Sequence, residues 1–230
     1  MQTMTETLQK LIGKPLVEST DQEIYLALLD LVRSKSAAQV RPVKGRKLYY
    51  ISAEFLIGKL LSNNLINLGL YDDVRDALAA AGKSLSDIEE VEPEPSLGNG
   101  GLGRLASCYM DAATGLNYPV TGFSIRYEFG IFRQKIVDGW QMEFPDNWLE
   151  MGDVWLHTRK DDAVEVRFGG QVHEWMDGDK FKTAQTGYQS VIAVPHDLYI
   201  SGYGSKAVNK LTLWSASICL LYTSPSPRDI

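Results

Sequence analysis

The most constraining feature of this chain is a glycine-rich run at residues 98–103, where four of six residues are glycine. Glycine is favoured where the backbone needs a positive φ or approaches a ligand too closely for a Cβ atom. Apolar residues at helical spacing follow the run, at Leu105, Met110, Ala113 and Leu116, and predict a helix that begins just after the glycines. Because bare N–H groups and the positive end of a helix dipole favour an anion, the run predicts a phosphate cradle.

The residues alone leave other interpretations of this run open. Gly98, Gly100 and Gly103 satisfy the dinucleotide-binding pattern G-x-G-x-x-G, which requires a strand before it. The preceding residues 92–96, Glu-Pro-Glu-Pro-Ser, are incompatible with a buried central strand, and neither the expected downstream acid nor a Walker-type lysine follows. A nucleotide site and a tightly packed connector without a ligand therefore stand beside the phosphate cradle.

Charge and composition argue against several classes of protein. The 230 residues carry a formal net charge of −6 without a basic stripe, which argues against nucleic-acid binding. Neither a membrane-spanning apolar run nor a signal-peptide pattern is present, so we expect a cytoplasmic chain without a membrane partner. The three histidines and the two cysteines, Cys108 and Cys219, lack metal-ligand spacing, and we expect no metal site and a buried Cys108.

The chain changes from helical to β character near residue 120. A helix is expected over residues 1–11, ending at Gly13, and Thr20 with Glu23 predicts a capping box for a second helix. Asp138-Gly139 between two β-prone runs predicts a hairpin, because this dipeptide suits a type I′ turn. Gly169-Gly170 predicts a second hairpin, formed by residues 164–168 and 171–176.

Glu54 is the second candidate site residue. It follows a buried strand predicted at residues 48–51, and the carboxyl ends of strands in α/β sheets often hold ligands. A carboxylate between Ala53 and Phe55 should be paired or functional, because burial of an unpaired charge is costly. A structural ion pair and a helix cap are the alternatives to a site role.

Four stretches of the chain resemble, in the correct order, the α-glucan phosphorylases of bacterial type, which act on glycogen, starch or maltodextrin. The resemblance runs from about Lys47 to Ser217. Ser124 departs from it, since the family usually has glycine there. The four stretches are residues 49–58 (YYISAEFLIG), 98–106 (GNGGLGRLA), 125–132 (IRYEFGIF) and 213–216 (LWSA).

The resemblance implies an α/β fold: an incomplete N-terminal lobe of a two-lobe, Rossmann-like (GT-B type) enzyme, with a helical start followed by strands and hairpins. We expect a helical segment at residues 1–46 and the truncated lobe at residues 47–218. Residues 219–230 resemble a translated sequencing adapter, and we expect an artefactual, disordered tail there.

The resemblance also implies a function for the full-length parent. Such enzymes cleave terminal α-1,4 bonds of a glucan with inorganic phosphate, release glucose 1-phosphate, use the phosphate of pyridoxal phosphate, and are usually homodimers. Gly100 and Gly101 would line the phosphate and glucosyl subsite, Leu102 would pack on the sugar, and Asn99 and Glu54 would lie close by. The cofactor lysine and most catalytic residues belong to later parts of the family's chain, so we expect the 230 residues alone to be inactive. A non-catalytic glucan-binding or interaction module is the alternative.

Overall fold

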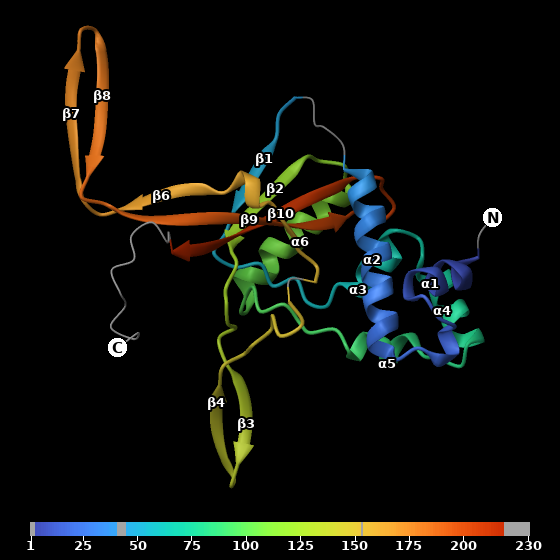
Figure 1. Ribbon diagram of the computed structural model, residues 1–230. Coiled ribbons are helices and arrows are strands. Elements are labelled where there is room, and N and C mark those ends of the chain that lie inside the picture. Colours follow the sequence, from blue (N-terminus) through green and yellow to red (C-terminus); the bar gives the residue numbers. More distant parts are fainter. Residues whose placement is uncertain (1–2, 41–44, 153, 219–230) are drawn as a thin grey trace.

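The computed structural model describes residues 3–40, 45–152 and 154–218, so the tail expected at residues 219–230 lies outside the described ranges. The first five α-helices gather at one end of the molecule, and a mixed sheet with a further helix against it and two projecting hairpins forms the rest (Figure 1). The helical elements are α1 (Met4–Ile12), η1 (Leu16–Glu18), α2 (Asp21–Gln39), α3 (Leu61–Asn67), α4 (Tyr71–Ala80), α5 (Leu85–Glu90), α6 (Gly101–Gly115) and η2 (Lys160–Asp162).

The central sheet has the strand order β1-β2-β10-β9-β5, and β6 also pairs with β9. β1, β2 and β10 are parallel, whereas β9 runs antiparallel to β10, β5 and β6. The mixed α/β class is therefore confirmed, with its helical start and its hairpins. The strands are β1 (Leu48–Ile51), β2 (Val120–Ile125), β3 (Arg133–Val137), β4 (Trp140–Phe144), β5 (His157–Thr158), β6 (Val164–Phe168), β7 (Gln171–Asp177), β8 (Lys180–Thr186), β9 (Gln189–Ser201) and β10 (Val208–Ile218).

The sequence correctly predicts the end of α1 and the start of α2, whereas α1 begins at Met4 and not at residue 1, because Thr3 is its N-cap. Thr20 accepts the Glu23 N–H while the Glu23 carboxylate accepts the Thr20 N–H, which completes the capping box of α2. Gly13 ends α1 in the left-handed conformation, with φ of 85°. None of the helices in the described part of the chain is long and apolar enough to cross a membrane.

Helix α6 packs on one face of the parallel strands. A Cβ atom at Gly122 on β2 would lie 2.9 Å from the Leu211 side chain, 3.3 Å from that of Phe55 and 3.4 Å from that of Met110. The absence of a side chain at Gly122 therefore lets the helix and the neighbouring strand close over β2. One hydrophobic core runs from Leu8 in α1 to Leu213 in β10, and the expected division at residue 46 stays a prediction.

The strand expected at residues 48–51 is confirmed as β1, but the expectation that it is buried is wrong. Leu48, Tyr49 and Ile51 are 57%, 59% and 81% exposed. The reason is that β1 lies at the edge of the sheet and pairs with β2 on one side only, within the described residues. Cys108 is also exposed, because the buried positions of α6 lie on a different stripe of the helix.

The hairpin predictions are right in one case and wrong in the other. β3 and β4 pair around Asp138 and Gly139, whose φ values of 52° and 81° fit a type I′ turn. Gly169-Gly170 does not close a hairpin, since β6 pairs with the long strand β9 and β7 pairs with β8 instead. The two glycines, both with positive φ, connect one sheet to the next, and the β7–β8 hairpin projects away from the body (Figure 1).

Candidate functional site

The candidate site lies at the carboxyl ends of β1 and β2. The two strands are parallel, with Ile51 beside Phe123, so the residues that follow them emerge at the same edge of the sheet. The Ser52 N–H donates to the Phe123 carbonyl at 3.1 Å and extends this contact by one residue. Glu54 therefore lies at the carboxyl end of a strand, as predicted, and the glycine run packs against it.

The glycine run makes a sharp turn into α6. Gly100 precedes the helix with φ of 97° and ψ of −156°, a conformation essentially restricted to glycine. The helix begins at Gly101, inside the glycine run and earlier than expected, because Gly101 and Gly103 adopt helical backbone angles. Residues 93–100 contain no strand, so the dinucleotide pattern lacks the element that it requires.

Both ends of the loop are fastened to the segment after β1. The Phe55 N–H donates to the Leu97 carbonyl at 2.8 Å, and the Leu56 N–H donates to the Gly103 carbonyl at 3.0 Å. A Cβ atom at Gly98 would lie 2.6 Å from the Leu56 nitrogen, and one at Gly103 would lie 3.1 Å from the Glu54 side chain. Two of the four glycines are thus required by close packing between the segments.

Side chains add further links between these segments. Oε2 of Glu54 accepts the Asn99 N–H at 3.0 Å. The Arg104 guanidinium donates to the Leu56 carbonyl at 3.3 Å, which ties the first turn of α6 to the same segment. The Ala53 carbonyl accepts hydroxyl groups from Ser124 at 3.1 Å and Tyr127 at 2.9 Å.

A cavity of about 460 Å³ opens beside the loop. Among the predicted site residues, Glu54 and Asn99 line it, whereas Gly100, Gly101 and Leu102 lie at the adjacent start of α6. Gly101 and Leu102 are exposed, Leu102 to 82%. The cavity is lined by Glu54, Ser96, Gly98, Asn99, Tyr127, Phe129, Gly130, Ile131, Phe132 and Asp146.

Sequence reasoning missed three polar residues of this cavity. Ser96 donates a hydrogen bond to the Asp146 carboxylate, and Tyr127 reaches the Ala53 carbonyl. The position of Tyr127, just after the strand parallel to β1, is a signal that could have identified it. Asp146 offers no such signal, because it lies beyond the β3–β4 hairpin and reaches the cavity through tertiary packing.

A buried carboxylate fixes the approach to the loop. Glu92 is 3% exposed and accepts the N–H groups of Leu60 and Leu61 at 2.8 and 3.1 Å and the Trp155 indole N–H at 2.8 Å. Burial raises the pKa of its carboxyl group, and the three donors oppose that rise without cancelling it. Because Glu92 directly precedes the Pro93–Pro95 run, it anchors the segment that leads into the glycines.

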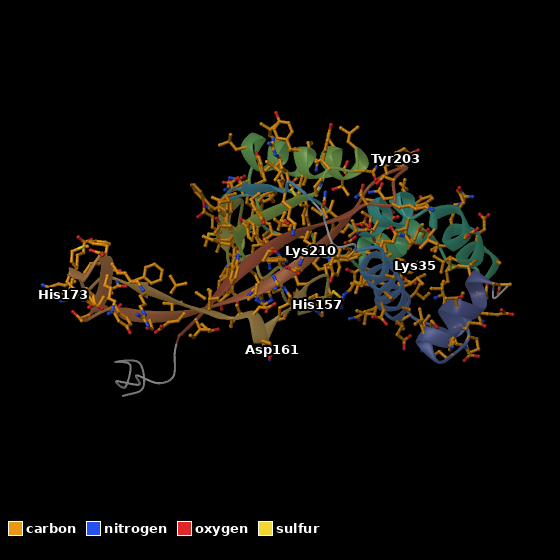
Figure 2. The ribbon with its side chains drawn as sticks, turned by 90° about the horizontal axis from the view of Figure 1, so that it is seen from above. Lys35, His157, Asp161, His173, Tyr203 and Lys210 are labelled. Atoms are coloured by element: carbon orange, nitrogen blue, oxygen red, sulfur yellow. The ribbon has the colours of Figure 1, made fainter. Side chains whose placement is uncertain are left out.

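The described residues offer no metal site, since no three His, Cys, Asp or Glu side chains gather within them. His157 lies on the sheet and His173 on the projecting β7–β8 hairpin, well separated (Figure 2). His196 is buried between Thr158 and Ser215, with both ring nitrogens 2.8 Å from a hydroxyl oxygen.

Comparisons with known proteins agree with the sequence resemblance. Residues 78–223 match the family model described as carbohydrate phosphorylase. Glycogen phosphorylase of Bacillus subtilis is 41% identical over 91% of this chain and 27% of its own length. Maltodextrin phosphorylase of Streptococcus pneumoniae is 44% identical over 93% of this chain and 26% of its own length. Human brain-form glycogen phosphorylase is 43% identical over 74% of this chain and 20% of its own length. The chain spans about a quarter of the length of the first two relatives.

Proposed function

Because this chain belongs to the carbohydrate phosphorylase family, we propose that it forms part of the N-terminal lobe of an α-glucan phosphorylase. In this proposal the parent is a cytoplasmic, homodimeric enzyme with two Rossmann-like lobes of GT-B type. It cleaves the terminal α-1,4 bond of a glucan with inorganic phosphate and releases glucose 1-phosphate. This chain supplies one wall of the active site and is inactive alone.

The main support for the proposal is that the N–H groups at the start of α6 lie next to a cavity lined by carboxylates and aromatic rings. The start of α6 presents backbone N–H groups and a positive dipole end, which favour phosphate. The adjacent cavity is lined by two carboxylates, Glu54 and Asp146, and by the rings of Phe129 and Phe132. Carboxylates accept sugar hydroxyls and aromatic faces pack on sugar rings, so a phosphate and a glucosyl unit can lie side by side.

The site residues divide between these two environments. Gly100 and Gly101 line the phosphate and glucosyl subsite, and the Gly101 N–H faces the substrate phosphate. Leu102, 82% exposed at the helix start, packs against the glucosyl ring. Asn99 and Glu54 line the cavity next to that ring. Backbone N–H groups suit this task, because they stabilise developing negative charge without bulk and without a proton to lose.

The family resemblance implies pyridoxal phosphate as the cofactor of the parent. The described residues fit a phosphate group, because a Cβ atom built at Gly101 meets no described atom within 4 Å and the residues Gly100, Gly101 and Leu102 are exposed. When bound, the cofactor supplies a phosphate that exchanges a proton with the substrate phosphate. The residues of this chain hold and orient the substrate phosphate, and no lysine here stands in a context that resembles the family's cofactor lysine.

The proposal is tested by the parent gene and its product. The source genome is sequenced past the codon for Ser217 by a method without adapters, and the complete frame is expressed. We expect phosphate-dependent release of glucose 1-phosphate from maltodextrin, which Gly101→Val abolishes while Glu94→Gln, an exposed neighbour, leaves it unchanged. A complete frame that encodes no further lobe, or a product that ignores phosphate, would refute the assignment.

A glucan-binding module is the second candidate, and exposed tryptophans favour it. Trp140 on β4 and Trp175 on β7 are 75% and 45% exposed on the projecting hairpins. Native electrophoresis in gels with and without glycogen separates the two functions. A binding module is retarded by glycogen and loses retardation on Trp140→Ala, whereas the isolated lobe migrates equally in both gels.

A further inference from the structure

The Glu54 carboxylate lies after β1 and reaches the middle of the glycine loop, where it accepts the Asn99 N–H. We propose that Glu54 is a positioning residue: its Oε2 atom holds the Asn99 N–H and so fixes the first turn of α6 for an anion, without binding phosphate itself. The inference rests on the proposed function for the identity of that anion. In this proposal the Glu54 carboxylate interacts with the loop and makes no contact with the phosphate.

Main-chain bonds and side-chain bonds both attach the loop to the segment after β1, and Glu54 supplies the side-chain bond at the middle of the loop. Main-chain bonds fix Leu97 and Gly103 at its two ends. Between them, the bond of 3.0 Å from Asn99 to Glu54 holds the residue directly before Gly100. Since Gly100 has φ of 97° and the conformational freedom of glycine, the direction of the following N–H groups depends on how Asn99 is held.

The charge of Glu54 suits the helix and opposes a direct phosphate contact. Gly100 provides no side-chain cap, and a carboxylate close to the first turn of a helix interacts favourably with its dipole. A second anion in contact with the same carboxylate would meet like-charge repulsion. Glu54 therefore acts as a cap supplied from another segment, and phosphate must occupy the N–H groups beyond Asn99.

The backbone that carries the Glu54 carboxylate is itself held in place. The Glu54 N–H donates to Ser52 Oγ at 3.2 Å, and Ser52 Oγ donates to the Glu54 carbonyl at 2.8 Å. The preceding Ala53 carbonyl accepts two hydroxyl groups, and Gly103 lies against the Glu54 side chain. Because this backbone is fixed and Gly103 packs beside the side chain, the carboxylate stays in position to hold Asn99.

The test is NMR on the 230-residue chain with Glu54→Gln, Glu54→Ala and, as a matched control, the exposed Glu94→Gln. The first readout is the Asn99 amide proton, whose hydrogen exchange should be the same in the wild type and in the control. Its hydrogen exchange should stay near the wild-type rate in Glu54→Gln, which keeps an acceptor. It should become about five- to tenfold faster in Glu54→Ala, the factor expected for one lost hydrogen bond.

Inorganic phosphate is the probe for the second readout. Phosphate should shift the Gly101 amide resonance in the wild type and in Glu54→Gln, and much less in Glu54→Ala. Unchanged Asn99 exchange in Glu54→Ala, or loss of the phosphate response in Glu54→Gln as complete as in Glu54→Ala, would overturn the inference. If the Asn99 results are as expected but phosphate shifts nothing in the wild type, the positioning role stands and the phosphate assignment fails.

Discussion

Alanine at Gly98 measures how tightly the glycine loop is held against the segment after β1. Its Cβ atom would lie 2.6 Å from the nitrogen and 3.0 Å from the Cα atom of Leu56, and backbone atoms cannot move aside individually. Forcing an extra atom into a packed site costs about 1–3 kcal/mol. The resulting shift would also break the two main-chain bonds that start at Phe55 and Leu56, at about 1 kcal/mol each. We therefore expect Gly98→Ala to lower the free energy of unfolding by about 3–5 kcal/mol.

The assay is urea unfolding followed by the fluorescence of the tryptophans, of which Trp148 and Trp155 are buried. Gly101→Ala is the matched control, because a Cβ atom there meets no described atom within 4 Å and the backbone is helical. The control should remain within about 0.5 kcal/mol of the wild type. If Gly98→Ala is as stable as Gly101→Ala, the close approach of Gly98 to Leu56 is refuted.

Three further predictions concern charge and capping. Burial raises the pKa of Glu92 above its usual 4.5. The wild type should therefore lose stability relative to Glu92→Gln as the pH rises from about 4.5 through the raised pKa, and thermal melts across that range measure the difference. Burial opposes ionisation of Asp197, but its ion pairs with Lys210 and Arg159 outweigh burial and lower its pKa. Asp197→Ala should lower the free energy of unfolding by about 3 kcal/mol at neutral pH. The stability advantage of the wild type over this variant should fade as the pH drops below about 3.8 through the lowered pKa. Thr20→Ala should cost about 1 kcal/mol in urea unfolding, since α2 loses its N-cap, and an unchanged midpoint would contradict this role.

Features set by neighbouring residues could be predicted from the sequence. The capping box at Thr20, the helix end at Gly13 and the turn at Asp138 each depend on residues within one turn of chain. Gly169-Gly170 has the same local signature as a hairpin turn, but β9 offers β6 a longer partner that lies far along the sequence. The exposure of β1 was missed for the same reason, because burial depends on which strands flank it.

Two parts of the candidate site could be predicted from the sequence. The glycine run and Glu54 are visible in the sequence, since glycine density and an acid in an apolar stretch are both unusual. The link between Glu54 and Asn99 spans 45 residues and depends on tertiary contacts, among them the main-chain bonds from Phe55 and Leu56 to the loop. Asp146 enters the cavity through the fold of the β3–β4 segment, which sequence spacing cannot indicate.

The parallel pairing of β2 with β10 has a consequence for the order of folding. β2 ends at Ile125 and β10 begins at Val208, so the segment between them, which contains both projecting hairpins, must close as a long loop when these strands pair. Hairpins form within microseconds, whereas contacts between distant segments are slowed by the entropy of closing a long loop. We expect β3–β4 and β7–β8 to form early and the parallel sheet late. The glycine loop needs β1 and β2 to be aligned, and it should acquire its final shape among the last parts of the molecule.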